Sequence, residues 1–184
     1  MYKRQGFYFP AFPYKSYEGM TDEDVLDIGA YLLAQPAVEA QAPANELPGW
    51  LFRWTIAGWN ALESLLNPDF AEPADPVIAR GAYLARHMGH CGECHTPRNA
   101  LGFLDQAREF AGGELDGKKV GAIDAEAFSS WSEDAFALFL TLGLKPDGDF
   151  VGGKMEPVIE HNTSRLTAED KEAMVAFFVR GQER

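Results

Sequence analysis

Both cysteines of this 184-residue chain lie in one pentapeptide, Cys91-Gly92-Glu93-Cys94-His95. The spacing Cys-x-x-Cys-His is the pattern of covalent haem attachment in c-type cytochromes. Two thiols at this spacing can each form a thioether with a vinyl group of one haem, while the adjoining imidazole binds the iron. We therefore predict that Cys91 and Cys94 hold a haem c and that His95 is its proximal iron ligand.

Two other interpretations of the pentapeptide stay open. A Cys-x-x-Cys pair can be a redox dithiol, but that class is associated with a βαβ pattern, and the flanking sequence here favours helices. A structural zinc site needs four ligands. Besides the two cysteines, the histidines available to complete such a site are His87, His90, His95 and His161.

The composition is that of an acidic globular protein. Apolar residues make up 46% of the chain and the net charge is −12 at pH 7. This charge argues against nucleic acid as a partner, and it is equally compatible with steering a basic partner protein and with simple solubility. The most apolar segment, residues 47–66, is interrupted by Arg53, Asn60 and Glu63, so it lacks the uninterrupted apolar run of a membrane span. Any membrane association is expected to be peripheral.

The N-terminal residues do not show the basic start, apolar stretch and cleavage site of a secretion signal. Haem c attachment in bacteria nevertheless takes place outside the cytoplasm. We therefore expect a periplasmic protein whose signal peptide is missing from this sequence, with residues 1–5 foreign to it.

Two segments repeat one pattern for the start of a helix. Thr21 and Thr167 each have an aspartate three positions later, close to a capping box, with more acidic residues near the positive end of the helix. The first segment stops at Gln35-Pro36 and the second near Gly181. We interpret them as the C-terminal helices of a two-member internal repeat. Their apolar faces are formed by Val25, Ile28 and Leu32 in the first and by Met174, Phe177 and Phe178 in the second.

The region between these helices predicts a linker and a second unit. Residues 37–74 read as a linker with a short amphipathic helix at 54–66, and residues 75–184 as a complete domain. Within that domain we expect one helix from Asp75 and another capped by Ser132 and ended by Gly143. Residues 118–123 are too short and too broken by glycine to predict a sheet. The predicted fold class is all-α.

A haem iron that only carries electrons is usually six-coordinate, so a second axial ligand is expected. Met1 is terminal, Met88 lies too near Cys91 to reach the opposite haem face, and Met174 has the helical spacing of a core residue. Met155 remains, in the irregular segment 152–157, whose glycines let the backbone approach the haem. His161 is the second candidate and would give an iron of lower potential than a thioether ligand.

Three further residues are candidates for contacts around the haem. Pro97 follows the proximal histidine and is a candidate to place a backbone carbonyl against its Nδ1–H. Arg98 and Trp131 can donate hydrogen bonds to a haem propionate. An ordinary surface arginine and an ordinary core tryptophan are the alternatives for these two.

Four strings of this sequence carry a resemblance to a known family: AFPYKSYEGMTDED, PANELPGWLFRWTIAGWN, ARGAYLARHMGHCGECHTPRN and FVGGKMEPVIEHNTSRLT. They resemble the tandem-domain class I cytochrome c subunits, dihaem or trihaem, of bacterial gluconate, alcohol and related dehydrogenases. The resemblance covers nearly the whole chain from Gly6. It implies class I cytochrome c domains in the periplasm that pass electrons from a dehydrogenase catalytic subunit to a quinone, an oxidase or another cytochrome of the respiratory chain.

The resemblance also implies that residues 1–36 are the C-terminal remnant of a first haem domain. Met20 matches the distal methionine of that domain, whose Cys-x-x-Cys-His is absent from this chain. One haem c is therefore expected here and a second in the full-length parent. The aromatic residues that would have lined the missing haem are expected to be partly exposed or packed elsewhere; they are Phe7, Tyr8, Phe9, Phe12 and Tyr14.

The sequence thus predicts an electron-transfer protein and not an enzyme. A six-coordinate iron has no open position for a substrate, and the chain shows no catalytic triad or carboxylate pair. The alternative is a dihaem enzyme, such as a peroxidase or a thiosulfate dehydrogenase, with a five-coordinate or weakly ligated iron. A metal-free or zinc-binding interaction module is the third possibility.

Overall fold

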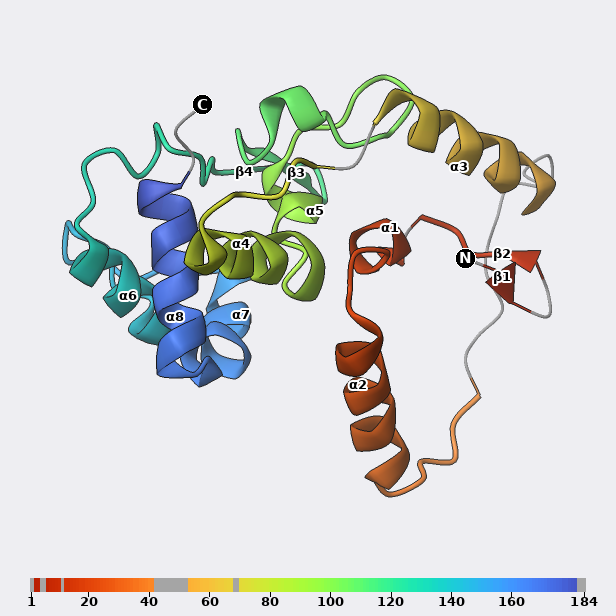
Figure 1. Cartoon of the computed structure of the whole chain (residues 1–184), viewed down its shortest axis with the longest axis horizontal. Coiled ribbons are helices and arrows are strands. Elements are labelled where there is room, and N and C mark those ends of the chain that lie inside the picture. The colour runs from red at the N-terminus through yellow and green to blue at the C-terminus, as the bar shows by residue number, and fades with distance from the viewer. Residues whose placement is uncertain (1, 4–5, 11, 42–52, 68–69, 182–184) are drawn as a thin grey trace. The chain divides into compact units, whose positions relative to one another are not determined.

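The computed structural model describes residues 2–3, 6–10, 12–41, 53–67 and 70–181 (Figure 1). Its contacts divide the chain into two units, Met1–Pro68 and Asp69–Arg184. The second unit holds the Cys-x-x-Cys-His pentapeptide.

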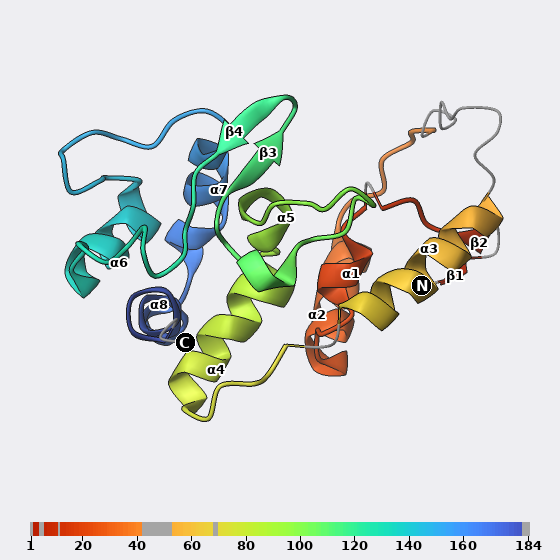
Figure 2. The same ribbon diagram turned by 90° about the horizontal axis from the view of Figure 1, so that it is seen from above.

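The second unit is built mainly from helices (Figure 2). α4 (Pro76–Tyr83) and α8 (Ala168–Val175) each continue into a wider π-helical stretch, η1 (Leu84–Met88) and η4 (Ala176–Arg180). The other helices are α5 (Gly92–His95), η2 (Gln106–Arg108), α6 (Glu133–Leu142), α7 (Met155–His161) and η3 (Thr163–Arg165). Two short strands, β3 (Gly113–Leu115) and β4 (Lys118–Val120), complete the unit.

Side chains placed at the helix ends explain where these helices begin and stop. The Asp75 carboxylate accepts hydrogen bonds from the backbone N–H groups of Val77 and Ile78, at 2.8 and 3.1 Å, and α4 begins there. Ser132 caps α6 through Ala135 N–H at 3.1 Å, and Gly143 ends that helix at φ +72°, a left-handed conformation that suits glycine. These predicted helix ends are confirmed.

α4 and α8 cross at very short range. A Cβ built on Gly81 would lie 2.0 Å from the carbonyl oxygen of Ala173, so the two backbones meet where α4 has no side chain. On the rim of this crossing, Arg80 donates two hydrogen bonds to the Asp170 carboxylate, at 2.7 and 3.1 Å. The glycine is therefore required for the helix packing of this unit.

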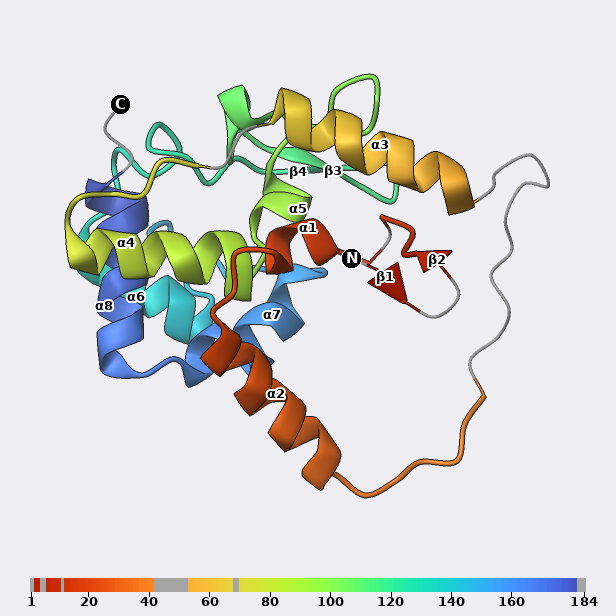
Figure 3. The ribbon, with the colours of Figure 1, turned by 45° about the vertical axis from the view of Figure 1, so that its right-hand side comes forward.

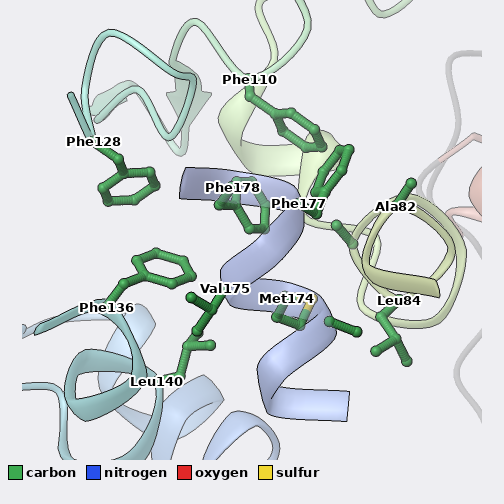
Figure 4. Close-up of a cluster of buried hydrophobic side chains, with 12 residues drawn as sticks. Ala82, Leu84, Phe110, Phe128, Phe136, Leu140, Met174, Val175, Phe177 and Phe178 are labelled. Carbon is green, nitrogen blue, oxygen red and sulfur yellow. The ribbon is translucent and has the colours of Figure 1, made fainter. Parts of the chain in front are cut away.

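The core of the second unit is aromatic (Figure 4). Phe177 and Phe178 on η4 meet Phe110 edge-on, with ring centroids 6.0 and 5.3 Å apart. Phe128 and Phe136 continue the cluster toward α6, with centroids 4.7 Å apart. Met174 is buried in the same core, as its helical spacing predicts.

The unit is mainly helical, in line with the predicted fold class, but β3 and β4 pair as an antiparallel hairpin. The prediction that residues 118–123 are unsuited to a sheet is therefore wrong. The two-residue turn of the hairpin is Asp116-Gly117, with φ of +52° and +73°. Asp-Gly is a preferred pair for a turn whose two central residues both have positive φ, and such a turn matches the twist of a hairpin. Gly117 belongs to this turn, whereas Gly121, the glycine within residues 118–123, follows the end of β4.

The described residues of the first unit form two short strands and three helices (Figure 3). β1 (Tyr2–Lys3) pairs antiparallel with β2 (Gly6–Phe7), and the helices are α1 (Tyr14–Tyr17), α2 (Asp22–Ala34) and α3 (Arg53–Leu66). α3 contains the helix expected within the linker. It packs against this unit, because the buried Tyr14 donates from its hydroxyl to Asn60 at 2.6 Å and Lys15 pairs with Glu63 at 3.0 Å.

α2 begins and ends as predicted but buries none of its side chains. Thr21 caps it by accepting from the Asp24 N–H at 3.2 Å. Leu32 is nevertheless 63% exposed, whereas Phe178, at the same distance from the capping threonine in the second unit, is 2% exposed. The apolar face that α8 buries is therefore uncovered on α2.

Candidate haem-attachment site

α5 places both sulfurs and the imidazole on one helical turn. Cys91 caps the helix, and its carbonyl oxygen accepts from the N–H groups of Cys94 at 3.3 Å and His95 at 3.0 Å. Residues three and four positions apart lie on the same face of a helix, so the three side chains project from neighbouring positions. The helix joins η1 through the bond from Cys91 N–H to the Ala85 carbonyl, at 2.9 Å.

The hydrogen bond of His95 determines which ring nitrogen is left for a metal. Its Nδ1 lies 2.7 Å from the carbonyl oxygen of Gly121. A carbonyl can only accept, so Nδ1 carries the proton and the lone pair of the neutral ring is on Nε2. Burial lowers the pKa of His95, against the opposing effect of the bond to Gly121, which favours this neutral form. The ring thus presents the nitrogen that an iron would bind.

The carbonyl on Nδ1 was expected from Pro97, and the structure gives that role to Gly121. The Pro97 carbonyl instead accepts from the N–H of Asp105 at 2.8 Å. The Pro97 carbonyl is thus engaged with Asp105, and the imidazole of His95 is held by the Gly121 carbonyl instead. Gly121 comes from the segment after β4, and nothing in the local sequence around His95 points to it.

The segment 110–121 closes around α5 through backbone contacts (Figure 2). Gly112 donates to the His95 carbonyl at 2.8 Å, and Phe110 donates to the buried hydroxyl of Thr96 at 3.0 Å. A Cβ built on Gly113 would lie 2.3 Å from the Cys94 carbonyl oxygen, so only glycine allows this approach. Contacts of the hairpin and of the residues that flank it therefore fix the position of α5, and the contact from Gly121 reaches the ring of His95.

The two thiols have raised pKa values. Burial raises the pKa of Cys91 to about 12. Burial also raises the pKa of Cys94, and so does the Glu93 carboxylate, while Arg98 and Lys154 act in the opposite direction. Reactive dithiols have lowered pKa values, so these surroundings do not favour a redox pair. Protonated thiols suit addition to a vinyl group, in which the sulfur and its hydrogen add to the two carbons of the double bond.

Met155 is the first residue of α7 and is half-buried. Gly153, two residues before it, has φ +67°, and the intervening Lys154 forms an ion pair with Asp116 in the turn of the β3–β4 hairpin. His161, the other candidate ligand, lies at the far end of α7, where it is exposed and 3.8 Å from Glu160. Met155 is therefore the candidate whose segment is tied to the hairpin that supports His95.

The other residues predicted to contact the haem, Arg98 and Trp131, make contacts within the protein. Arg98 donates to the Glu93 carboxylate at 2.6 Å and to the Gly102 carbonyl at 2.9 Å. Trp131 is half-buried and stacks edge-on with Phe128 and Phe139, with centroids 5.1 and 5.4 Å apart. The proximity of either residue to a propionate stays a prediction.

Met20, in the first unit, is half-buried. Among the aromatic residues near it in the sequence, Phe12 is exposed and Tyr14 is buried.

Comparison with known proteins identifies the relatives of this chain. A diheme cytochrome c-type protein of Cereibacter sphaeroides is 38% identical over 177 residues, which cover 94% of this chain and 59% of that protein. The cytochrome c subunit of gluconate 2-dehydrogenase from Pantoea cypripedii is 34% identical, with 92% and 42% covered. This chain is related to the cytochrome c subunits of bacterial dehydrogenases.

The fructose dehydrogenase cytochrome subunit of Gluconobacter japonicus is a further relative of this chain, 31% identical over 176 residues. That alignment covers 92% of the chain and 36% of the relative. The chain thus spans less than two thirds of the length of these relatives. Their names describe cytochromes, which agrees with the prediction of an electron-transfer protein and not of an enzyme. No family model matches the sequence.

The described residues show neither a metal-binding cluster nor a membrane-spanning helix. No cluster of three or more histidine, cysteine, aspartate or glutamate side chains there is arranged to hold a metal ion. The described helices also include none with the length and hydropathy needed to cross a membrane.

Proposed function

We propose that this cytochrome carries electrons through one haem c that is attached at Cys91 and Cys94, with His95 and Met155 as axial ligands. The observation that carries the proposal is the single turn of α5, which presents two thiols and a neutral imidazole whose Nδ1–H is held by Gly121 at 2.7 Å. When bound, the haem supplies a one-electron couple at its iron. The residues of the chain attach it, orient the imidazole and cover it from water.

Met155 is the proposed distal ligand because its segment is irregular, half-buried and tied through Lys154 to the hairpin beside His95. A thioether is a soft ligand that favours ferrous iron and raises the reduction potential. Such a potential suits a carrier that delivers electrons toward an acceptor of high potential. Arg98 and Trp131 are proposed to donate hydrogen bonds to a haem propionate.

The names of the relatives support a place for this chain in a periplasmic dehydrogenase complex. We propose that a dehydrogenase catalytic subunit donates electrons to the haem and that a quinone, an oxidase or another cytochrome accepts them. The net charge of −12 is suited to steering partners with basic docking faces. Peripheral contact with the membrane would bring the protein to a quinone.

Expression together with a bacterial cytochrome c maturation system tests the attachment. The purified chain should keep its haem stain after denaturing electrophoresis and should have the mass of the polypeptide plus one haem. A colourless chain at the mass of the bare polypeptide would refute the proposal.

Replacing Met155 by alanine should abolish the weak red absorption band of a methionine-bound ferric iron while the covalent haem is retained. The reduction potential should fall on the order of 0.1 V, within the ~0.8 V range that axial ligands span. The matched control is His161→Ala at the other end of α7, which should leave the band and the potential unchanged.

The opposite pattern of these two variants would identify His161 as the ligand. A spectrum that Met155→Ala leaves unchanged, together with turnover of peroxide or thiosulfate, would favour the dihaem enzyme. Absorption spectroscopy and potentiometric titration measure both effects.

We also propose that the first unit is the C-terminal part of another cytochrome c domain, with Met20 as its distal methionine. The repeat between α2 and α8 supports this proposal. Ile28, Tyr31 and Leu32 occupy the same positions after the capping threonine as Met174, Phe177 and Phe178. The second set is buried against α4 and the aromatic core, and the first set is exposed. In this proposal α2 corresponds to α8 and η4, and its apolar side chains are exposed where those of the second unit pack against α4.

A pair of equivalent substitutions tests whether α2 lacks its cover. Leu32→Ser should change the free energy of unfolding by less than about 0.5 kcal/mol, as surface substitutions do. Phe178→Ser should cost about 3–5 kcal/mol, because it removes a buried aromatic ring. Chemical denaturation followed by circular dichroism measures both. A similar large cost for Leu32→Ser would show that α2 is already covered, and the proposal for the first unit would fail.

A further inference from the structure

The two proposed iron ligands belong to segments that are far apart in the sequence and are supported differently. His95 is held through the backbone, by Gly112 on its carbonyl and by Gly121 on its ring, and both glycines flank the β3–β4 hairpin. Met155 follows Gly152 and Gly153, of which the second has φ +67°. A segment with two adjacent glycines needs a further contact to keep a fixed position, because glycine leaves the backbone its greatest freedom.

The ion pair between Asp116 and Lys154 joins these two segments. Asp116 is the first residue of the hairpin turn, at φ +52°, and its position follows from the paired strands on either side. Lys154 immediately precedes Met155 and takes the capping position of α7, where its side chain makes no capping hydrogen bond with the helix. The pair spans 38 residues of sequence. It links the turn of the hairpin to the residue before the proposed ligand.

We propose that the Asp116–Lys154 ion pair is a positioning contact that holds the Met155 sulfur at the haem iron by tying its segment to the hairpin that orients His95. The inference rests on the proposed His95 and Met155 ligation. Asp116 and Lys154 touch neither haem nor iron in this proposal. They act through Met155, by opposing the movement of the glycine-rich segment away from the hairpin.

The size of the effect follows from the exposure of the pair. The two side chains are 70% and 67% exposed, and exposed ion pairs contribute about 0.2–1 kcal/mol. Loss of the pair should therefore shift the equilibrium between bound and released Met155 by up to about fivefold. It should not abolish ligation.

Competition with imidazole measures this equilibrium in the ferric holoprotein. Imidazole can bind the iron only when Met155 leaves, and at about pH 8 it is uncharged, so its approach does not depend on nearby charges. The variants Asp116→Asn and Lys154→Gln should each bind imidazole about two- to fivefold more tightly than the parent protein. The double variant should match either single variant, because each change already breaks the same contact. Asparagine keeps the positive φ that the turn requires.

Two controls separate loss of the contact from loss of a charge. Lys154→Arg keeps the charge and should restore the imidazole affinity of the parent protein. Arg108→Gln removes another exposed ion pair, with Asp105 at 2.8 Å, and should leave the affinity unchanged.

If the Asp116 and Lys154 variants acted only through their lost charges, they would shift the reduction potential in opposite directions. Removing the carboxylate of Asp116 should raise the reduction potential and removing the ammonium group of Lys154 should lower it, because positive charge favours the reduced iron. Opposite shifts in potential without any change in imidazole affinity would overturn the inference. A rise in imidazole affinity of both variants, cancelled in Lys154→Arg, supports it.

The parent protein shows separately whether the underlying ligation is correct. If its ferric spectrum carries the red methionine band, a failure in the variants concerns the ion pair alone. If that band is absent from the parent protein, the proposed Met155 ligation fails and the inference falls with it.

Discussion

The double variant Cys91→Ala/Cys94→Ala is expected to contain no covalently bound haem and to lose the cooperative unfolding of its second unit. These are the two cysteines of the chain, so no other thiol can replace them. Half-buried apolar side chains pack around the core of this unit and are suited to covering a large apolar cofactor; they include Met88, Ile123, Trp131, Phe139 and Leu166. Loss of a cofactor that binds only the folded state removes its binding free energy from the stability, on the order of several kcal/mol.

Haem staining, mass spectrometry and a thermal melt followed by circular dichroism measure these effects. The single variant Cys91→Ala, matured in the same way, keeps one cysteine that can form a thioether and the proposed ligand His95. It is therefore a control that lies between the parent protein and the double variant. A double variant that melted sharply without haem would show that the protein core does not need the cofactor, contrary to this expectation.

Gly81→Ala is expected to destabilise the second unit by about 3 kcal/mol, at the upper end of the cost of overpacking. The new methyl group would lie 2.0 Å from the Ala173 carbonyl oxygen and 2.6 Å from Cβ of Phe177. Neither is the flexible end of a side chain, so α4 and α8 must separate. The gain in helix propensity from glycine to alanine is at most about 1 kcal/mol, and the steric cost decides the sign.

Gly29→Ala is the matched control, because Gly29 also lies inside a helix, α2, and a Cβ there would meet no atom within 4 Å. That change should be neutral or stabilising by up to about 1 kcal/mol. Urea denaturation of both variants supplies the comparison. Equal stability of Gly81→Ala and the parent protein would mean that the two helices tolerate a wider crossing than the structure shows.

The features that depend on neighbours in the sequence were predictable from it. Helix starts at Thr21, Asp75, Ser132 and Thr167 rest on hydrogen bonds to N–H groups two or three residues later, so local sequence is sufficient to predict them. The haem-attachment motif is also local. The exception is the β3–β4 hairpin: residues 118–123 are short and contain a glycine, which predicted no sheet, although the Asp-Gly turn before them is also a local signal.

The sequence by itself therefore predicted the haem-attachment motif, the starts of four helices and the candidate ligands. The tertiary structure alone decided which carbonyl orients His95, why Gly81 and Gly113 must lack side chains, and that Lys154 meets Asp116. Those contacts join residues 26 and 38 positions apart in the case of the carbonyl and the ion pair. Such pairings depend on how the chain folds back on itself, and a spacing pattern read along the sequence contains no information about which distant backbone group will arrive.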